Sequence, residues 1–303
     1  MLLNQLEPSL SIHVIERLDV AAAESSGAWQ NAGTGHSAFC ELNYTPELPD
    51  RTVETSKAVD IAEAFEVSKQ FLSYLVKQNL VCSLDQFIRS IPHMSFVWEN
   101  ENLNFLRNRL AKLTECHLFK DMAYSDDPIQ LKEWMPLVIE GRAPEESVAA
   151  TKMDLGTDVN FGSLTRMMFN ALKEMDQVKM NFNLEVKDLK QEDGVWEIKV
   201  KDLEVGDKTI LKAKFVFIGA GGGSLPLLEK SDISEGKSYG GFPVSGQWLK
   251  CINLDVVEKH NAKVYGKAAD GSPPMSVPLL DTRMIEGKKH YFLIPMLVFL
   301  PDF

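Results

Sequence analysis

Residues 24–45 (ESSGAWQNAGTGHSAFCELNYT) combine small and polar side chains and follow no helical or strand period. Their centre is GTGH, at 33–36. Small residues let a backbone approach a flat ligand closely, and exposed N–H groups can bind the ligand's oxygens. A plain surface loop is the alternative, although Trp29 and Phe39 are large apolar residues that favour burial. The segment is therefore a candidate ligand-binding loop.

A second glycine-rich stretch, GAGGG at 219–223, follows the apolar run FVFI at 215–218. Such a run is typical of a buried parallel strand. A helix is predicted to begin near Leu225. A strand, a glycine turn and a helix together present backbone N–H groups to a phosphate. A simple tight turn is the competing interpretation of these glycines.

Glu16 is the third candidate, because it directly follows the short apolar strand SIHVI at 11–15. In a dinucleotide-binding βαβ unit, an acidic residue at a strand end lies about 20 residues after a G-x-G-x-x-G turn. Only 15 residues precede Glu16, and none of them is glycine. The chain therefore either lacks that unit or begins inside it. On this feature alone, an ordinary surface glutamate is favoured.

Apolar periodicity predicts the elements that position these residues. Helical spacing indicates helices over 57–80, 100–118 and 163–175, the last with Ser163 as its N-cap, and a short helix at Leu2–Leu6. Residues 94–98 alternate as a half-buried strand does. These segments are expected to pack a core rather than to carry chemistry.

Residues 180–218 change to an alternating apolar and polar pattern, interrupted by turn residues at 192–194 and 205–207. That pattern predicts a three-stranded antiparallel meander. Its last strand becomes continuously apolar at 215–218. The tail, 291–303, is almost wholly apolar, and a strand whose partners are missing is its first interpretation.

The composition excludes several classes of protein. The chain has 303 residues, 45% of them hydrophobic and 25% charged, with a net charge of −11. These values match a soluble globular protein and disfavour a nucleic-acid-binding protein. The four cysteines are widely separated, and the histidines have no metal-ligand spacing, so no metal site is expected. No run of about 18 apolar residues is present.

Several stretches together resemble the malate:quinone oxidoreductase family. They are VIERLD (14–19), residues 24–47, IPHMSFVW (91–98), GTDVNFGSLTR (156–166), KFVFIGAGGGSL (214–225), GFPVSGQWL (241–249) and KVYGKAADGSPPMSVPLLDTR (263–283). The resemblance runs from about residue 2 to about residue 290. Within the wider flavoprotein superfamily, NAGTGHSA and PPMSVP are specific to this family.

The resemblance implies an enzyme that oxidises (S)-malate to oxaloacetate and passes electrons through FAD to a membrane quinone. It implies a mixed α/β fold, in which a partial FAD-binding, Rossmann-like domain is interleaved with a substrate domain on a mixed sheet. Residues 1–50 and 156–228 would belong to the FAD-binding domain, and 51–155 and 229–303 to the helical and substrate part. The protein would be cytoplasmic, peripheral on the inner face of the cytoplasmic membrane, with no nucleic-acid partner.

The resemblance also implies roles for individual residues. Glu16 would bind the adenosine ribose, Arg17 would lie beside the adenine, and Val186 would contact the adenine through its backbone. Arg283 would bind a carboxylate of malate, although by residue type alone a surface ion pair is favoured. His36 would be either the proton acceptor or a wall of the flavin site, with the wall ranked slightly higher. The remaining cofactor contacts would come from Ser25, Ser26, Asn31, Gly33, Thr34, Gly35, His36, Gly219, Ala220, Gly221 and Gly222.

Three departures from the family pattern lead to further expectations. The family's glycine-rich phosphate turn would lie upstream of Met1, and the family extends past residue 303, so a chain truncated at both ends is expected. Family members carry a histidine in S-V-P-H where this chain has Leu279, and a leucine cannot accept a proton. Read two nucleotides later with suitable codons, 292–303 can give a sequence like the family's F-G-P-aromatic-A-x-F-S-T stretch, which predicts an out-of-frame tail.

Two alternatives to a malate:quinone oxidoreductase stay open. One is another FAD-dependent dehydrogenase or oxidase of a 2-hydroxy or 2-amino acid, because the superfamily fold alone allows it. The other is an inactive truncated remnant, which the missing glycine turn and Leu279 favour.

Overall fold

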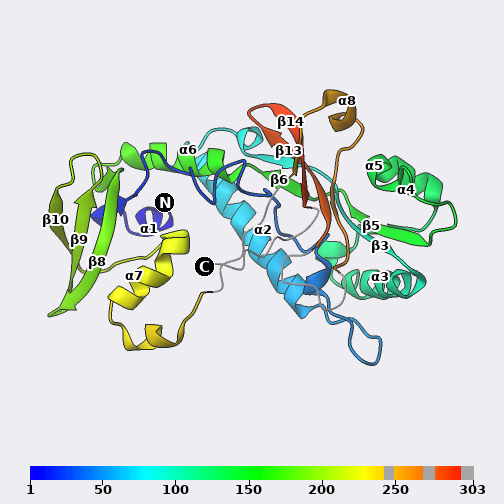
Figure 1. Ribbon diagram of the computed structural model, residues 1–303, viewed down its shortest axis with the longest axis horizontal. Helices are drawn as coiled ribbons and strands as arrows, with labels where there is room; N and C mark the ends of the chain where they lie inside the picture. Colours follow the sequence, from blue (N-terminus) through cyan, green and yellow to red (C-terminus); the bar gives the residue numbers. More distant parts are fainter. Residues whose placement is uncertain (242–248, 269–276, 295–303) are drawn as a thin grey trace. The chain divides into compact units, whose positions relative to one another are not determined.

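The computed structural model describes residues 1–241, 249–268 and 277–294, and the chain forms two compact units (Figure 1). Unit 1 contains Met1–Gln30 and Gly162–Val244, and unit 2 contains Asn31–Phe161 and Ser245–Phe303. Each unit is thus built from two separate stretches of sequence. The fold is mixed α/β, as predicted. The assignment of the predicted segments to FAD binding and substrate binding stays a prediction.

Unit 1 begins with α1 (Leu2–Leu6) and β1 (Ile12–Ile15), both in predicted places. β1 pairs in parallel with β7 (Val178–Asn181). The predicted third helix is α6 (Phe161–Lys173), which starts two residues before Ser163. The proposed N-cap is therefore wrong, and Ser163 lies inside the first turn.

The predicted meander is confirmed as β8 (Leu184–Glu192), β9 (Val195–Asp202) and β10 (Lys208–Ala213) (Figure 1). Both strand pairs are antiparallel. Its turns contain Gly194 at φ +77° and Gly206 at φ +84°, backbone conformations that favour glycine. Leu189, Ile198 and Val200 form the buried centre of this layer.

The predicted parallel strand at 215–218 is not formed. Among the described residues no strand pairs with this run, and a strand needs a neighbouring backbone for its hydrogen bonds. The run still has two faces. Val216 and Ile218 pack against the meander core, whereas Phe215 and Phe217 are 73% and 80% exposed. A short 3₁₀ turn (Gly221–Gly223) and α7 (Ser224–Lys230) follow, and α7 lies against β8.

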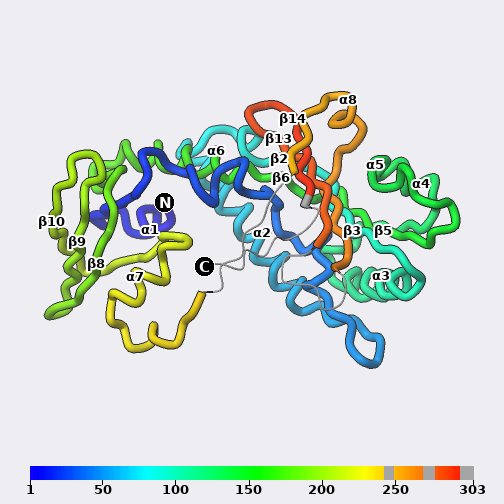
Figure 2. Tube along the Cα trace, in the orientation of Figure 1, coloured from blue at the N-terminus to red at the C-terminus, as the bar shows by residue number. Residues whose placement is uncertain are grey.

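Unit 2 is built on a mixed seven-stranded sheet, in the order β11-β14-β13-β12-β3-β5-β4. Its strands are β3 (His93–Trp98), β4 (Ala123–Ser125), β5 (Val148–Met153), β11 (Leu249–Cys251), β12 (Lys263–Tyr265), β13 (Leu279–Ile285) and β14 (Lys288–Ile294). β12 and β3 are parallel, and the other neighbours are antiparallel. Figure 2 shows β13 and β14 in the same part of the molecule as β3 and β5, although they are far apart in sequence, and β12 lies between β13 and β3 in the sheet.

The two longer predicted helices of unit 2 are confirmed as α2 (Ser56–Lys77) and α3 (Asn100–Leu113). Both helices end a few residues earlier than predicted. The other elements are α4 (Pro128–Trp134), α5 (Pro136–Ile139), α8 (Leu254–Val257) and the antiparallel pair β2 (Ile88–Ser90) and β6 (Thr157–Val159). β3 was expected to be half-buried, but five of its six residues are buried. It lies inside the sheet and is covered on both faces, which alternation alone does not reveal.

The first residues of the apolar tail, Tyr291–Ile294, end β14 and pair with both β13 and β11. The expectation of a strand without partners is therefore wrong for these residues. Residues 295–303 lie outside the described residues, as does most of the stretch predicted to be out of frame.

The two faces of the 215–218 run generate a stability prediction. Phe217→Ser should change the free energy of unfolding by less than about 0.5 kcal/mol, because the ring is already in water. Val216→Ser should cost about 1–2 kcal/mol, because its methyl groups pack against the meander core. Urea denaturation of both variants measures the difference, and equal losses would contradict this packing.

Candidate functional site

The candidate ligand-binding loop lies along β6 as a short additional strand. Thr34 forms an antiparallel bridge with Asp158, the Val159 N–H donates to Gly33 O at 2.6 Å, and the Gly35 N–H donates to Thr157 O at 3.1 Å. Gly33, Thr34 and Gly35 are buried, whereas His36 is exposed. Residues 33–35 of the loop are therefore a fixed part of unit 2 rather than the plain surface loop of the alternative.

A buried group of charged side chains lies beneath this loop. Asp158 Oδ1 is 3.2 Å from both Lys263 Nζ and Arg283 Nε, and its Oδ2 accepts the Met284 N–H at 3.0 Å. Lys263 also reaches Asp281 at 3.4 Å and donates to Ala32 O at 2.9 Å. These four charged residues are at most 3% exposed. Buried charges are tolerated only when they are paired, and here two cations face two carboxylates.

Arg283 connects this charged group to the loop. Its Nη1 donates to Asn31 O at 2.8 Å, and its Nη2 donates to Val159 O at 3.4 Å. The surface ion pair considered from the sequence is wrong, because the side chain is fully buried. Burial lowers the pKa of Arg283, and the negative charges of Asp158 and Asp281 oppose that effect.

The glycines of the loop make room for side chains of this protein. Gly33 has φ +63°, and a Cβ there would lie 1.7 Å from Arg283 Nη1. A Cβ at Gly35 would lie 1.9 Å from Thr157 Oγ1 and 2.6 Å from the Phe65 ring. Both positions therefore require glycine, for packing inside the protein rather than for a ligand.

Thr34 joins the loop to the centre of the sheet. Its hydroxyl is 2.8 Å from the Tyr265 hydroxyl, which donates to Asp281 at 3.3 Å. Burial raises the pKa of Asp281 to about 6, and the charge of Lys263 opposes the shift. Burial also raises the pKa of Tyr265, so this hydroxyl stays a neutral donor.

His36 is the exposed member of the loop. Its Nδ1 lies 2.8 Å from Glu41 Oε1, and its side chain is 54% exposed while that of Glu41 is 5% exposed. The Glu41 carboxylate, on the accepting side of its contact with Nδ1, raises the pKa of His36. Burial acts to raise the pKa of Glu41, but the hydrogen bond and charge of His36 outweigh it, and the pKa is lowered. The pair can therefore hold a proton at Nδ1 and leave Nε2 for other partners.

His93, from β3, is a second histidine of this region. It is fully buried, and its Nε2 accepts the Thr157 N–H at 3.1 Å. Burial lowers the pKa of His93 to about 4. Its neutral ring thus holds β6 in place beneath the loop.

The remaining predicted site residues belong to unit 1. Glu16 follows β1, its Oε1 accepts the Leu18 N–H at 2.9 Å, and its backbone O accepts the Leu184 N–H at 3.0 Å. This bond places Glu16 at the start of β8, the strand that contains Val186. Arg17 pairs with Glu24 at 3.6 Å. The other members are Ser25, Gly219, Ala220, Gly221 and Gly222, which are exposed, and Ser26, which is half-buried.

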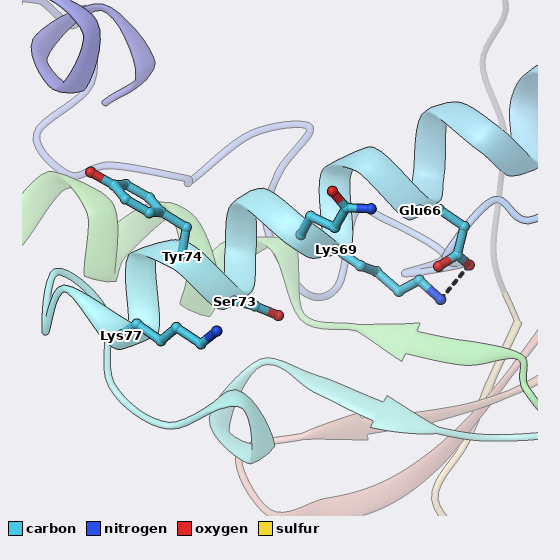
Figure 3. Close-up of a pocket in the computed structure, with 6 residues that line it drawn as sticks. Glu66, Lys69, Ser73, Tyr74 and Lys77 are labelled. Atoms are coloured by element: carbon cyan, nitrogen blue, oxygen red, sulfur yellow. Dashed lines mark ion pairs between the residues drawn. The ribbon is translucent and has the colours of Figure 1, made fainter.

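A shallow groove on α2 contains none of the predicted site residues (Figure 3). All the residues that line it come from this one helix: Glu66, Lys69, Gln70, Ser73, Tyr74 and Lys77. A Glu66–Lys69 ion pair at 2.5 Å crosses it. A groove on one face of one helix encloses no ligand, so it is not a candidate active site. Among the described residues, no three His, Cys, Asp or Glu side chains are grouped as a metal site.

Sequence reasoning missed Glu41, Asp158, Lys263 and Asp281. A signal for Asp281 was present, since it and the predicted Arg283 occupy alternate positions of an otherwise largely apolar strand. Residues at i and i+2 point to the same face, and charges on a buried face must find partners. Lys263 and Asp158 lie in three-residue strands, which are too short to show that pattern.

A family model and the curated relatives that match this chain agree on one family. A family model described as malate:quinone oxidoreductase matches residues 1–303. A "Probable malate:quinone oxidoreductase" of Flavobacterium johnsoniae is 60% identical over 100% of this chain and 61% of its own length. One of Pseudomonas aeruginosa is 54% identical over 99% of this chain and 56% of its own length. The chain thus spans about three fifths of the length of these relatives.

Solved structures share the fold at low identity. L-α-glycerophosphate oxidase from Mycoplasma pneumoniae, with FAD bound, matches 94% of this chain and 65% of its own, with a TM-score of 0.61 and 14% identity. Glycine oxidase from Geobacillus kaustophilus matches 92% of this chain and 63% of its own, with a TM-score of 0.62 and 12% identity. In the part of the chain that the structure describes, no helix has the length and apolarity to cross a bilayer.

The loop geometry predicts that Gly33→Ala is severely destabilising. The new methyl group would combine a positive φ with a clash against a buried guanidinium, and we expect a loss of more than about 3 kcal/mol in unfolding free energy. Gly194→Ala is the matched control, because its φ is +77° but nothing lies within 4 Å of the added atom. It should cost about 1 kcal/mol. Equal losses in urea denaturation would rule out the Arg283 contact.

His93 predicts a dependence of stability on pH. Its pKa is about 4 when folded and about 6.5 when unfolded, so between these values the unfolded chain binds the extra proton. Acidification through this window should cost about 1.4 kcal/mol of stability per pH unit from His93, while Asp281, with its raised pKa, opposes part of the loss. His93→Gln should flatten the dependence measured by urea melts from pH 7 to 5. Exposed His117→Gln should not, and a matching change there would refute the assignment.

Proposed function

The chain belongs to the malate:quinone oxidoreductase family, and we propose that the whole protein oxidises (S)-malate to oxaloacetate and passes the electrons through FAD to a membrane quinone. The match of the family model over residues 1–303 carries this proposal. Because the chain spans 61% of the length of the Flavobacterium relative, the activity is proposed for the whole protein.

The residues of unit 1 fit an FAD cofactor. Glu16 lies at the carboxyl end of a parallel strand, where dinucleotide-binding folds place the acid that binds ribose hydroxyls. Added Cβ atoms at Gly221 and Gly222 would meet nothing within 4 Å, so a ligand can approach this backbone closely. We propose that these residues hold the cofactor, with Arg17, Ser25, Ser26, Val186, Gly219 and Ala220 beside them.

The roles in unit 2 concern the flavin and the substrate. When bound, FAD supplies the oxidant that takes the hydride from the carbinol carbon of malate. The hydroxyl proton must go to a base, and His36 offers an exposed imidazole with a raised pKa. We propose His36 as that base, and Asn31, Gly33, Thr34 and Gly35 as the fixed backbone beside it.

For Arg283, the contacts support a different role from carboxylate binding. Its guanidinium is buried and bonded to Asp158, Asn31 and Val159. Freeing it for malate would leave Asp158 buried with one cation fewer, and breaking such a pair costs several kcal/mol. We therefore propose that Arg283 positions the loop and that malate meets its cations elsewhere in the whole protein.

Other substrates and an inactive remnant were the alternatives from the sequence. The structural neighbours are named for glycerophosphate and glycine, which shows that the fold alone does not determine the substrate. The family match and 54–60% identity favour malate. We further propose peripheral association with the inner face of the cytoplasmic membrane, because a membrane quinone is the electron acceptor.

A chimera tests the function. In it, this chain's sequence replaces the matched region of the Flavobacterium johnsoniae relative. We expect the chimera to bind FAD and to reduce a soluble ubiquinone analogue when (S)-malate is added. Glu16→Gln should raise the Kd for FAD about tenfold, because a charged acceptor binds hydroxyls about 1.4 kcal/mol more strongly than a neutral amide oxygen. Flavin fluorescence titration measures this Kd.

Glu7→Gln is the matched control, since Glu7 is an exposed glutamate of the same unit. It should leave the Kd unchanged. A flavin-loaded chimera that reduces quinone with another 2-hydroxy acid but not with malate would overturn the substrate assignment. A flavin-loaded chimera with no donor activity would support the inactive remnant.

A further inference from the structure

We propose that Glu41 is the positioning residue that orients His36 and makes it the proton acceptor of the reaction. The inference rests on the proposed function for its chemistry, but its structural part concerns this chain alone. The observation behind it is a carboxylate buried beneath an exposed imidazole, within one short segment of unit 2.

The polar contacts of the His36 ring select one of its two tautomers. Glu41 Oε1 lies 2.8 Å from His36 Nδ1, and the Tyr44 hydroxyl lies 3.5 Å from the same nitrogen. With Nδ1 facing the carboxylate, the Nδ1–H tautomer is selected, and the lone pair is left on Nε2. The imidazole is 54% exposed, and the contacts with Glu41 and Tyr44 are both made at Nδ1 rather than at Nε2.

The segment that carries Glu41 is held rigidly by hydrogen bonds from neighbouring elements. The fully buried Arg109 of α3 donates to Ala38 O at 3.1 Å and to Thr45 Oγ1 at 2.9 Å, on either side of Glu41. Ser95 of β3 donates to Cys40 O at 3.1 Å. Ala38 has φ +59°, a strained conformation for a residue with a Cβ. The backbone is therefore held in a turn that returns the chain from His36 to Glu41.

The burial of the Glu41 carboxylate costs free energy. Glu41 is 5% exposed, and both of its oxygens are buried without a well-aligned hydrogen bond among the described residues; Oε1 meets His36 Nδ1 at 2.8 Å as an ion pair. Burying a carboxylate costs several kcal/mol unless it is paired, and the cation it can gain here is the imidazolium of His36. A glutamine of the same shape would avoid that cost. The charge is therefore explained by a state in which His36 carries a second proton.

The surrounding charges act on the protonation of His36 in both directions. Glu41 and Asp281 of β13 favour protonation of His36, while Lys263 of β12 disfavours it. His93 of β3 acts on Glu41, and Lys57 of α2 lies 5.1 Å from the centre of the Tyr44 ring. Glu41 is the nearest of these charges, and its hydrogen bond is the main cause of the raised pKa. Removing it should therefore change the basicity of His36 more than any other single change.

In the proposed step, malate loses a hydride and a proton to different acceptors. The C–H bond of the malate carbinol breaks, and its electron pair leaves with the hydrogen to the FAD oxidant of the proposed function. The O–H bond breaks as the C=O bond forms, and the proton goes to His36 Nε2. The Nδ1–H stays with His36, and Glu41 stays a carboxylate that stabilises the imidazolium, as in other carboxylate–histidine pairs.

The first experiment uses the 303-residue chain and needs no turnover. The pKa of His36 is measured by NMR titration of its ring protons, assigned with His36→Gln. In Glu41→Gln the pKa should fall by about one unit or more, because an opposite charge within hydrogen-bond distance is lost. Glu41→Asp keeps the charge and should give an intermediate value. Glu47→Gln is the matched control and should leave the pKa unchanged, since Glu47 pairs with Arg51 instead.

The second experiment measures kcat/KM of the chimera for malate against pH. A base must be unprotonated, so the rate rises as pH rises through the His36 pKa. Glu41→Gln should move this rise to lower pH and lower the plateau about tenfold or more, whereas Glu41→Asp should restore part of the plateau. If Glu41 only stabilised the fold, its replacement would lower the plateau of kcat/KM without changing the pH at which kcat/KM rises.

The outcomes separate the two proposals. A His36 pKa that does not fall in folded Glu41→Gln, with folding checked by circular dichroism, overturns the role of Glu41 whatever the chimera does. If Glu41→Gln does not fold, Glu41→Asp decides, and an unchanged His36 pKa in that variant together with an unchanged pH profile overturns the proposal. A shifted pKa in a chimera that ignores malate upholds the pair and refutes the proposed function.

Discussion

The carboxylate of Asp158 is the point on which unit 2 depends. It receives Lys263 from one strand and Arg283 from another, while its own backbone bridges to Thr34 of the loop. In water such pairs contribute little, but these side chains are almost fully buried, where an unpaired charge is very costly. The loop, β6, β12 and β13 can therefore occupy only an arrangement in which these charges meet. Because His36 belongs to this loop, the same constraint fixes its position.

Much of the fold follows from periodicity in the sequence. The long helices, the meander and the β1 strand are visible because each has a regular apolar pattern and suitable turn residues. The 215–218 run has the right pattern for a buried strand, but pattern describes only the run itself and not whether a neighbouring backbone is present. The burial of both faces of β3 is another property of neighbours, which single-sequence alternation does not contain.

The candidate site was predicted in part. The loop at 31–36 was recognised by its small residues, and Arg283 by the resemblance. The structure requires these residues for reasons other than the ligand contacts from which they were predicted. Gly33 is required by a guanidinium of the same protein, not by a ligand. Glu41 was missed because a glutamate in an unpatterned stretch gives no sign of burial, and only the folded backbone shows that it lies under His36. Long-range pairs between short strands, such as Lys263 with Asp158, are similarly invisible before folding.

The interleaving of the two units has a consequence for biosynthesis. β3 pairs with β5 on one side but must wait for β12, some 165 residues later, on the other. At a translation rate of about 5–20 residues per second, that wait lasts roughly ten to thirty seconds. During this time an apolar strand edge is open on the nascent chain, and such edges favour association with other chains. The chain is therefore most exposed to such association during the synthesis of residues 99–265.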